Sequence, residues 1–239
     1  MSAPTDVSVG GFVPLSTVDW PGQLVATVFT HGCPWDCPYC HNPHLLGHEP
    51  EDLAGSLGDA SAETTWADVM AFLGKRAGLL DGVVFSGGEP CAQRALLDAV
   101  QQVREAGFAV GLHTAGSVVS RFESVLPLVD WVGFDVKAPF DDYDRITHVA
   151  GSGAHALASL RALVGSGIEF EARTTVHPDL LTRDDLARLA DDLEREGVRR
   201  WAIQGYRADG VRPGLVPPQA LTPQMLPPGL AERFEFTLR

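Results

Sequence analysis

The sequence has few cysteines, fewer basic than acidic residues and no long apolar run, and each shortage excludes a class of protein. Four cysteines in 239 residues do not make the disulfide framework of a small secreted domain. Lys and Arg number 18 against 31 Asp and Glu, a formal net charge of −13, which argues against wrapping nucleic acid or binding an anionic membrane. No apolar stretch approaches the ~20 residues of a membrane helix, and the N-terminus lacks a signal-peptide pattern. We expect a cytoplasmic protein without nucleic-acid or membrane partners.

What remains is a globular composition, 45% hydrophobic, in which short apolar runs alternate with segments of helical period. Several of the runs are bounded by glycine and are apolar on both faces, as is typical of parallel strands covered on both sides. The predicted strands are Leu24–Thr30, Gly82–Ser86, Phe108–His113, Trp131–Val136, Ile168–Val176 and Trp201–Gln204. The predicted helices are 65–73, 90–106, 118–125, 154–164 and 182–197.

This alternation predicts the fold class. Six β–α units imply a curved parallel sheet and fall short of the eight units of a closed barrel. We expect an α/β protein with a partial (β/α)6 barrel that is open on one side. The predicted organisation is a lead segment over 1–22, the barrel over 23–205 and a Pro-rich extension over 206–239. That extension contains a covering loop, Tyr206–Leu230, and a closing edge strand within Arg233–Leu238.

Three of the four cysteines, Cys33, Cys37 and Cys40, fall within eight residues directly after the first predicted strand. Three interpretations compete. The thiols could be buried apolar fillers, although the loop's Pro, Asp and Trp residues do not resemble a core segment. With His41 or His44 they could close a tetrahedral zinc site. They could also hold three irons of a [4Fe–4S] cluster and leave the fourth iron open for a small molecule.

The stretch Cys-Pro-Trp-Asp-Cys-Pro-Tyr-Cys resembles the radical S-adenosylmethionine signature Cys-x3-Cys-x2-Cys, including the aromatic residue before the last cysteine. The resemblance implies the radical SAM type of partial barrel, with one [4Fe–4S] cluster on the three cysteines. S-adenosylmethionine would chelate the open iron, and its reductive cleavage would give a 5′-deoxyadenosyl radical. By the same resemblance Tyr39 borders the adenine.

Two further strand ends carry residues suited to this cofactor. In Phe85–Pro90, "FSGGEP", Gly87 and Gly88 allow close backbone approach to a ligand, and Glu89 offers a carboxylate to an ammonium group. The segment resembles the superfamily's Gly-Gly-Glu motif, which receives the methionine amino group. "LHTAG", Leu112–Gly116, resembles the Asp-Thr-Asn-Gly of pyruvate formate-lyase activating enzymes, which implies that Thr114 binds the cofactor. Here a His replaces the Asp of that motif, and a strand-end His is more often a structural hydrogen-bonding group.

The later strand ends complete the predicted site. "FDVKAP", Phe134–Pro139, resembles an Asp-x-Lys of the activating enzymes, which implies that Lys137, with Asp135, meets the methionine carboxylate. His177 follows the fifth predicted strand and is predicted to bind the cofactor. Arg173, Gln204 and Tyr206 are candidates to line the cofactor or substrate side. Cys91, the fourth cysteine, is predicted to be packed and not to bind the cluster.

The entry segment Leu15–Pro43, with its Val-Asp-x-Pro-Gly turn and its His-Asn-Pro after the last cysteine, resembles glycyl-radical-enzyme activating proteins. It is most similar to those of anaerobic ribonucleoside-triphosphate reductase. This implies hydrogen-atom abstraction from a glycine of a partner enzyme. No cysteine occurs in Leu45–Glu63, so one cluster is expected, reduced by a flavodoxin- or ferredoxin-like donor. Two alternatives stay open: a radical enzyme acting on a small molecule, as 7-carboxy-7-deazaguanine synthase does, and a zinc-stabilised binding module without turnover.

Overall fold

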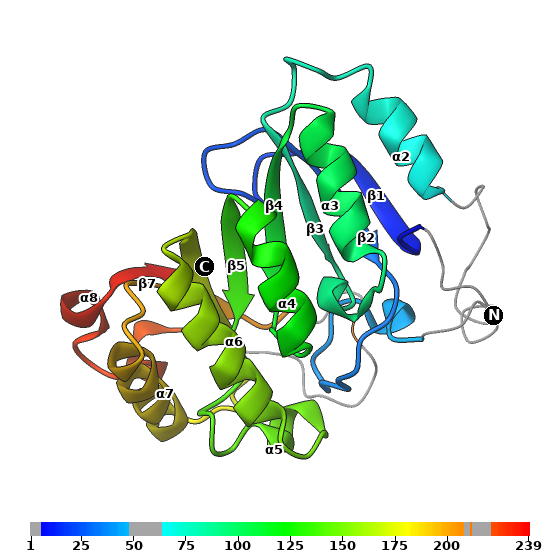
Figure 1. Cartoon of the computed structure of the whole chain (residues 1–239). Coiled ribbons are helices and arrows are strands. Elements are labelled where there is room, and N and C mark those ends of the chain that lie inside the picture. The colour runs from blue at the N-terminus through cyan, green and yellow to red at the C-terminus, as the bar shows by residue number, and fades with distance from the viewer. Residues whose placement is uncertain (1–5, 48–63, 208–210, 212–220) are drawn as a thin grey trace.

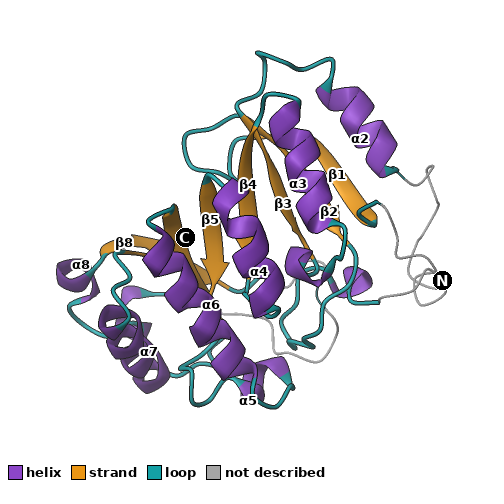
Figure 2. Cartoon of the chain, in the orientation of Figure 1, coloured by secondary structure: helices purple, strands orange, loops and turns teal. Residues whose placement is uncertain are grey.

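The computed structural model describes residues 6–47, 64–207, 211 and 221–239. Within them the chain forms one open sheet in which spatial order follows sequence order, β1 to β8. Only β1 is antiparallel to its neighbour; β2 to β8 pair in parallel (Figure 2). The strands are β1 Val9–Ser16, β2 Val25–Thr30, β3 Gly82–Gly87, β4 Ala109–Thr114, β5 Trp131–Asp135, β6 Glu169–Val176, β7 Arg200–Gly205 and β8 Glu235–Leu238. The predicted fold class, an α/β partial barrel, is confirmed.

Helices cover one face of this sheet, and α3, α4 and α6 lie in front of the strands in Figure 1. The helices described are α2 Trp66–Leu73, α3 Leu96–Glu105, α4 Val119–Val125, α5 Asp144–Thr147, α6 Ser152–Ser166, α7 Arg183–Arg195 and α8 Leu230–Arg233. Thr65 and Thr182 each begin a helix with a complete capping box, which satisfies backbone N–H groups of the first turn. Between helices and sheet lies the main core, where Phe85, Leu96 and Leu112 are fully buried.

The opposite, concave face is filled at one end by the turn between β1 and β2. Trp20 in that turn stacks on Trp131 of β5, with ring centroids 5.7 Å apart and planes 17° apart. A Cβ on Gly111 would lie 2.8 Å from the Trp20 ring, so β4 needs glycine at that position. The turn therefore packs against the inside of the curved sheet and closes the end opposite the carboxyl ends of β2 to β7.

Two predicted elements differ from the structure. The predicted helix 90–106 is a 3-10 turn, η2 Pro90–Ala92, followed by α3. Gln93 is extended (φ −74°, ψ 127°), and Arg121 Nη1 donates to the carbonyl oxygens of Cys91 and Ala92 at 2.9 and 2.6 Å. Because these carbonyls are bonded from outside, the chain does not continue as a helix there. The lead segment also contains β1, a strand that the sequence analysis does not predict.

The C-terminal residues Glu235–Leu238 form β8, paired in parallel with β7. Part of the predicted covering loop, residues 208–210 and 212–220, lies outside the described residues, and the predicted division at 22 and 205 stays a prediction. In the part of the chain that the structure describes, no helix is long and apolar enough to cross a bilayer.

Candidate active site

A pocket of about 780 Å³, including its mouth open to solvent, lies where the strands end. Every residue predicted to bind the cluster or the cofactor lines this pocket except His177. Of the three further candidates, Gln204 lines it, and Arg173 and Tyr206 do not. The lining comprises Cys33, Trp35, Cys37, Tyr39, Cys40, His41, Asn42, Leu46, Ser86, Gly87, Gly88, Glu89, His113, Thr114, Ala115, Asp135, Lys137, Thr175 and Gln204. The carboxyl ends of parallel strands meet at one edge of a sheet, which brings these distant segments together.

The cysteine loop leaves β2 and returns to the sheet at Leu45, whose carbonyl accepts from Gly32 N at 2.6 Å. Burial raises the pKa of both the Cys33 and the Cys37 thiols, that of Cys37 to about 11 although the Lys137 ammonium partly opposes the rise. Both thiols are therefore protonated at neutral pH in this form of the protein. Metal ions and clusters bind cysteine as the thiolate, so binding at this loop must release the protons of these thiols.

The two glycines of the Gly-Gly-Glu segment lie against the start of the cysteine loop. Gly87 has φ +108°, and a Cβ there would lie 2.4 Å from Thr30 N. A Cβ on Gly88 would lie 2.4 Å from Gly32 O, and Glu89 N donates to the same oxygen at 2.8 Å. The structure thus gives a packing reason for both glycines, in addition to the ligand approach that the sequence suggests.

The Glu89 carboxylate, which is 2% exposed, joins the ends of β3 and β4. Thr114 Oγ1 and Cys91 N donate to Oε1 at 2.6 and 3.0 Å, and Ala115 N donates to Oε2 at 2.9 Å. Burial raises the Glu89 pKa, and these donors partly oppose the rise. Thr114 therefore holds Glu89 in place while both residues line the pocket.

An ion pair follows β5. Lys137 Nζ donates to Asp135 Oδ2 at 2.8 Å. Burial disfavours the charge on both side chains, but the attraction between the two opposite charges is stronger. The Lys137 pKa therefore lies well above its usual value, and the Asp135 pKa is lowered. Tyr143, which the sequence analysis did not single out, accepts from Lys137 N at 2.9 Å through its buried hydroxyl. A lysine held charged at the pocket wall is suited to bind a carboxylate.

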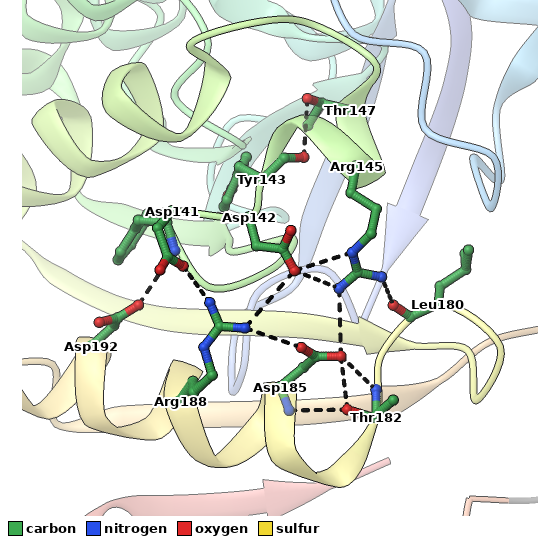
Figure 3. A network of polar contacts seen from close by, with 11 residues as sticks. Asp141, Asp142, Tyr143, Arg145, Thr147, Leu180, Thr182, Asp185, Arg188 and Asp192 are labelled. Atoms are coloured by element: carbon green, nitrogen blue, oxygen red, sulfur yellow. Dashed lines mark hydrogen bonds and ion pairs between the residues drawn. The ribbon is translucent and has the colours of Figure 1, made fainter.

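A polar network fixes the segment that carries Tyr143. Arg145 on α5 donates to Asp142 and to the carbonyl of Leu180, and Arg188 on α7 donates to Asp141 at 2.6 Å (Figure 3). Asp185, at the start of α7, lies 3.4 Å from both guanidinium groups. The same segment contacts the cysteine loop: Thr147 O accepts from Asp36 N at 3.0 Å, and the Tyr143 ring packs edge-on to Trp35. The network thereby supports the loop that carries the three thiols.

The remaining predicted residues lie around this centre. His177 is fully buried and is not part of the pocket lining, and its ring lies edge-on to that of Tyr206, with ring centroids 4.7 Å apart. His113 lines the pocket, with Nε2 2.7 Å from Asp19 O and 3.0 Å from Arg173 Nη1. Burial and the Arg173 charge lower the His113 pKa to about 4, which agrees with the structural role predicted for this His.

Asn42 and Thr175 are pocket residues that the sequence analysis missed. Asn42 Nδ2 donates to Gly87 O at 3.5 Å and so links the cysteine loop to β3. Thr175 is two residues from Arg173 on β6, and the two-residue period of a strand was the available signal that both side chains share a face. The sequence analysis used Asn42 only as part of the His-Asn-Pro that follows the last cysteine and gave it no role in the pocket.

The donor set fits a [4Fe–4S] cluster better than a single ion. In the described ranges, no three His, Cys, Asp or Glu side chains converge closely enough to hold one metal ion, as a closed zinc site requires. A cluster takes each thiolate on a different iron, so the three thiols need not converge on one point. On either side of Cys40, Tyr39 Oη and His41 Nε2 are buried without a hydrogen-bond partner in the described structure. Such groups are expected where a site holds a further group.

Comparison with known proteins agrees with this geometry. Residues 27–193 match the family model described as the radical SAM superfamily, and the chain belongs to that superfamily. A pyruvate formate-lyase-activating enzyme of Clostridium pasteurianum is 31% identical over 204 residues, 82% of this chain and 81% of that protein. A protein of Methanocaldococcus jannaschii named as a glycyl-radical enzyme activating enzyme is 29% identical, covering 76% of this chain and 73% of that one.

Other relatives carry different names. A PqqA peptide cyclase of Gluconobacter oxydans is 32% identical over 73% of this chain, which spans 46% of that protein. Among solved structures, QueE from Escherichia coli superposes with a TM-score of 0.58 at 16% identity, covering 99% of this chain and 95% of QueE. SuiB of Streptococcus suis bound to its precursor peptide gives 0.63 at 12% identity, with 90% of this chain and 48% of SuiB covered. At these identities the two structures support the fold alone.

Proposed function

We propose that this protein is a radical S-adenosylmethionine activating enzyme that abstracts a hydrogen atom from a glycine of a partner enzyme. The observation that carries the proposal is the single pocket lined by Cys33, Cys37 and Cys40 together with Glu89 and Lys137. Two relatives with activating-enzyme names support it over most of the chain. A bound [4Fe–4S] cluster and S-adenosylmethionine would supply the radical chemistry.

The chain's own residues have separate tasks in this proposal. The three cysteines hold the cluster. Glu89, positioned by Thr114, binds the ammonium of the methionine moiety, and Lys137, held charged by Asp135, binds its carboxylate. Gly87, Gly88 and Tyr39 line the same pocket and complete the cofactor site, whereas His177 lies outside its lining. The two ends of the methionine moiety would then be fixed from two different strands, β3 and β5, which restrains its orientation over the cluster.

The proposed partner is a glycyl radical enzyme, and the turn around Trp20 points to anaerobic ribonucleoside-triphosphate reductase. A flavodoxin- or ferredoxin-like protein would supply the electron. An open sheet leaves a side through which a peptide loop could reach the pocket, which a closed barrel does not.

The test is an anaerobic reconstitution with iron and sulfide followed by reduction. We expect a brown protein that converts S-adenosylmethionine to 5′-deoxyadenosine and generates a glycyl radical signal in the partner enzyme by electron paramagnetic resonance. Cys33→Ala should abolish cluster assembly and both reactions. Cys91→Ala is the matched control, because Cys91 is buried outside the cysteine loop, and it should retain them. A colourless protein that binds zinc and leaves S-adenosylmethionine intact would overturn the proposal.

A second candidate is radical modification of a peptide, favoured by the similarity to PqqA peptide cyclases. The same assay separates the two. Cleavage of S-adenosylmethionine without a glycyl signal in any candidate reductase, together with a mass change in a co-purifying peptide, would favour the peptide-modifying function. A mass change in a small molecule would instead favour the small-molecule alternative.

A further inference from the structure

Tyr39 carries a buried hydroxyl for which the described structure provides no hydrogen-bond partner. The residue is 3% exposed, and Oη itself is closed to solvent, so bulk water does not satisfy it. An unmade hydrogen bond of a buried group costs about 1–3 kcal/mol. Tyr39 directly precedes Cys40 and lines the pocket. The packing of the fold does not explain why a residue there carries an unbonded buried hydroxyl.

The groups around this hydroxyl narrow the explanation. Its charged and titratable neighbours are Lys137, Cys37, Tyr143 and Asp135. Lys137 has only donors and is bonded to Asp135. The Tyr143 hydroxyl already accepts from Lys137 N and donates to Asp135 O, at 2.9 and 3.4 Å. Tyr39 Oη bonds to neither Tyr143 nor Asp135 in this structure. Of the four groups, Cys37 is the one whose acceptor strength rises on loading, because metal binding converts a weakly accepting thiol into a thiolate.

We propose that the Tyr39 hydroxyl donates a hydrogen bond to a sulfur atom of the loaded cluster site, either the Cys37 thiolate or an adjacent sulfide. The inference rests on the proposed function to the extent that it requires a cluster on these cysteines. It assigns the side chain a role distinct from bordering a nucleotide. The bond is absent in the unloaded protein and forms when the site acquires its negative charge, so loading removes the cost of the orphaned hydroxyl.

This arrangement predicts that one substitution has opposite effects in the two states. Tyr39→Phe deletes a hydroxyl that makes no bond in the unloaded protein, so the melting temperature should stay unchanged or rise. In the loaded protein it deletes a charge-assisted bond, and the melting temperature should fall by about 3–12 °C. Hydrogen bonds to cluster sulfur also tune the reduction potential. Losing one should shift the cluster midpoint to a more negative value.

Tyr143→Phe is the matched control. It removes the same atom from another fully buried tyrosine of the same pocket region, but one whose hydroxyl is already bonded in the unloaded protein. It should lower the melting temperature of the unloaded protein by at least about 3 °C, because the substitution removes two hydrogen bonds and leaves Lys137 N without its acceptor.

The experiment compares wild type, Tyr39→Phe and Tyr143→Phe by anaerobic thermal melts before and after reconstitution with iron and sulfide, without S-adenosylmethionine. A redox titration of the loaded proteins follows. The inference is supported if Tyr39→Phe lowers the melting temperature only in the loaded state and makes the reduction midpoint of the cluster more negative. Equal effects in both states would overturn the inference, as would an effect that appears only after S-adenosylmethionine is added, because the acceptor would then belong to that cofactor. If wild type itself assembles no cluster, the proposed function fails instead, and iron and sulfide analysis of wild type identifies that case.

Discussion

The contact between Thr114 and Glu89 predicts a stability change that depends on pH. Thr114→Val keeps the shape of the side chain and removes one hydroxyl. That hydroxyl donates to Glu89 Oε1 at 2.6 Å and accepts from Gly116 N at 2.9 Å. Both partners are buried beside the pocket, so water does not replace the lost bonds.

The magnitude follows from these two bonds. A bond to a charged acceptor contributes about 1.5–3 kcal/mol, and an orphaned buried N–H costs about 1–3 kcal/mol. Part of this loss is offset because burying a valine is cheaper than burying a hydroxyl. We expect Thr114→Val to lower the free energy of unfolding by about 2–4 kcal/mol, which corresponds to about 4–16 °C in melting temperature for a domain of this size.

The pH dependence identifies the carboxylate as the cause. Burial raises the Glu89 pKa and the Thr114 hydroxyl partly opposes the rise, so removing the hydroxyl should raise this pKa further. The ionised carboxylate loses more than the protonated one. The destabilisation should therefore be largest above the Glu89 pKa and should shrink as the pH falls below it.

The assay is urea denaturation of the unloaded protein under anaerobic conditions, followed by circular dichroism between pH 5 and pH 8. Thr30→Val is the matched control: this threonine is fully buried, and its hydroxyl donates to a neutral acceptor, Ser86 O, at 3.2 Å. Its effect should be about 1 kcal/mol and independent of pH. A change below about 0.5 kcal/mol for Thr114→Val, or one equal at all pH values, would refute the reasoning, since a neutral hydrogen bond already contributes more than that.

Three further predictions follow from other contacts. Gly88→Ala should destabilise the protein and lower cluster yield, measured by melting and by iron content, because its Cβ would lie 2.4 Å from Gly32 O; wild-type values for both would contradict the contact. Trp20→Ala should cost about 3–5 kcal/mol in urea denaturation, because the indole fills the concave face and is 9% exposed; a loss under about 1 kcal/mol would show that the turn does not pack there. His113 should titrate near pH 4 by nuclear magnetic resonance, because burial and the Arg173 charge keep it neutral, so its contribution to stability should be lost as the pH falls from about 6.5; an observed pKa near its usual value would contradict this environment.

Local patterns predicted the regular elements well. All six predicted strands match within one residue at each end. Each is a short apolar run, and glycine marks the boundary of several of them. The two helices predicted to begin at 65 and 182 do begin there, each with a capping box at Thr65 or Thr182. The errors fall where tertiary contacts decide. The sequence around Cys91 predicts a helix, but in the structure the Arg121 guanidinium donates to the carbonyl oxygen of Cys91, and the segment is not an α-helix. β1 contains Pro14 and adjacent glycines, which disfavour a central strand but are tolerated at a sheet edge.

The sequence by itself determined the chemistry offered to the pocket: the spacing of Cys33, Cys37 and Cys40 and the polar residues at the strand ends. Only the tertiary structure decided which of those groups meet. It brought Thr114 to Glu89 across 25 residues, placed Tyr143 against Lys137 and left the Tyr39 hydroxyl without a partner. The physical reason is that parallel strands align their carboxyl ends whatever the length of chain between them. Hydrogen bonds between such ends depend on register and side-chain packing, which a linear pattern does not contain.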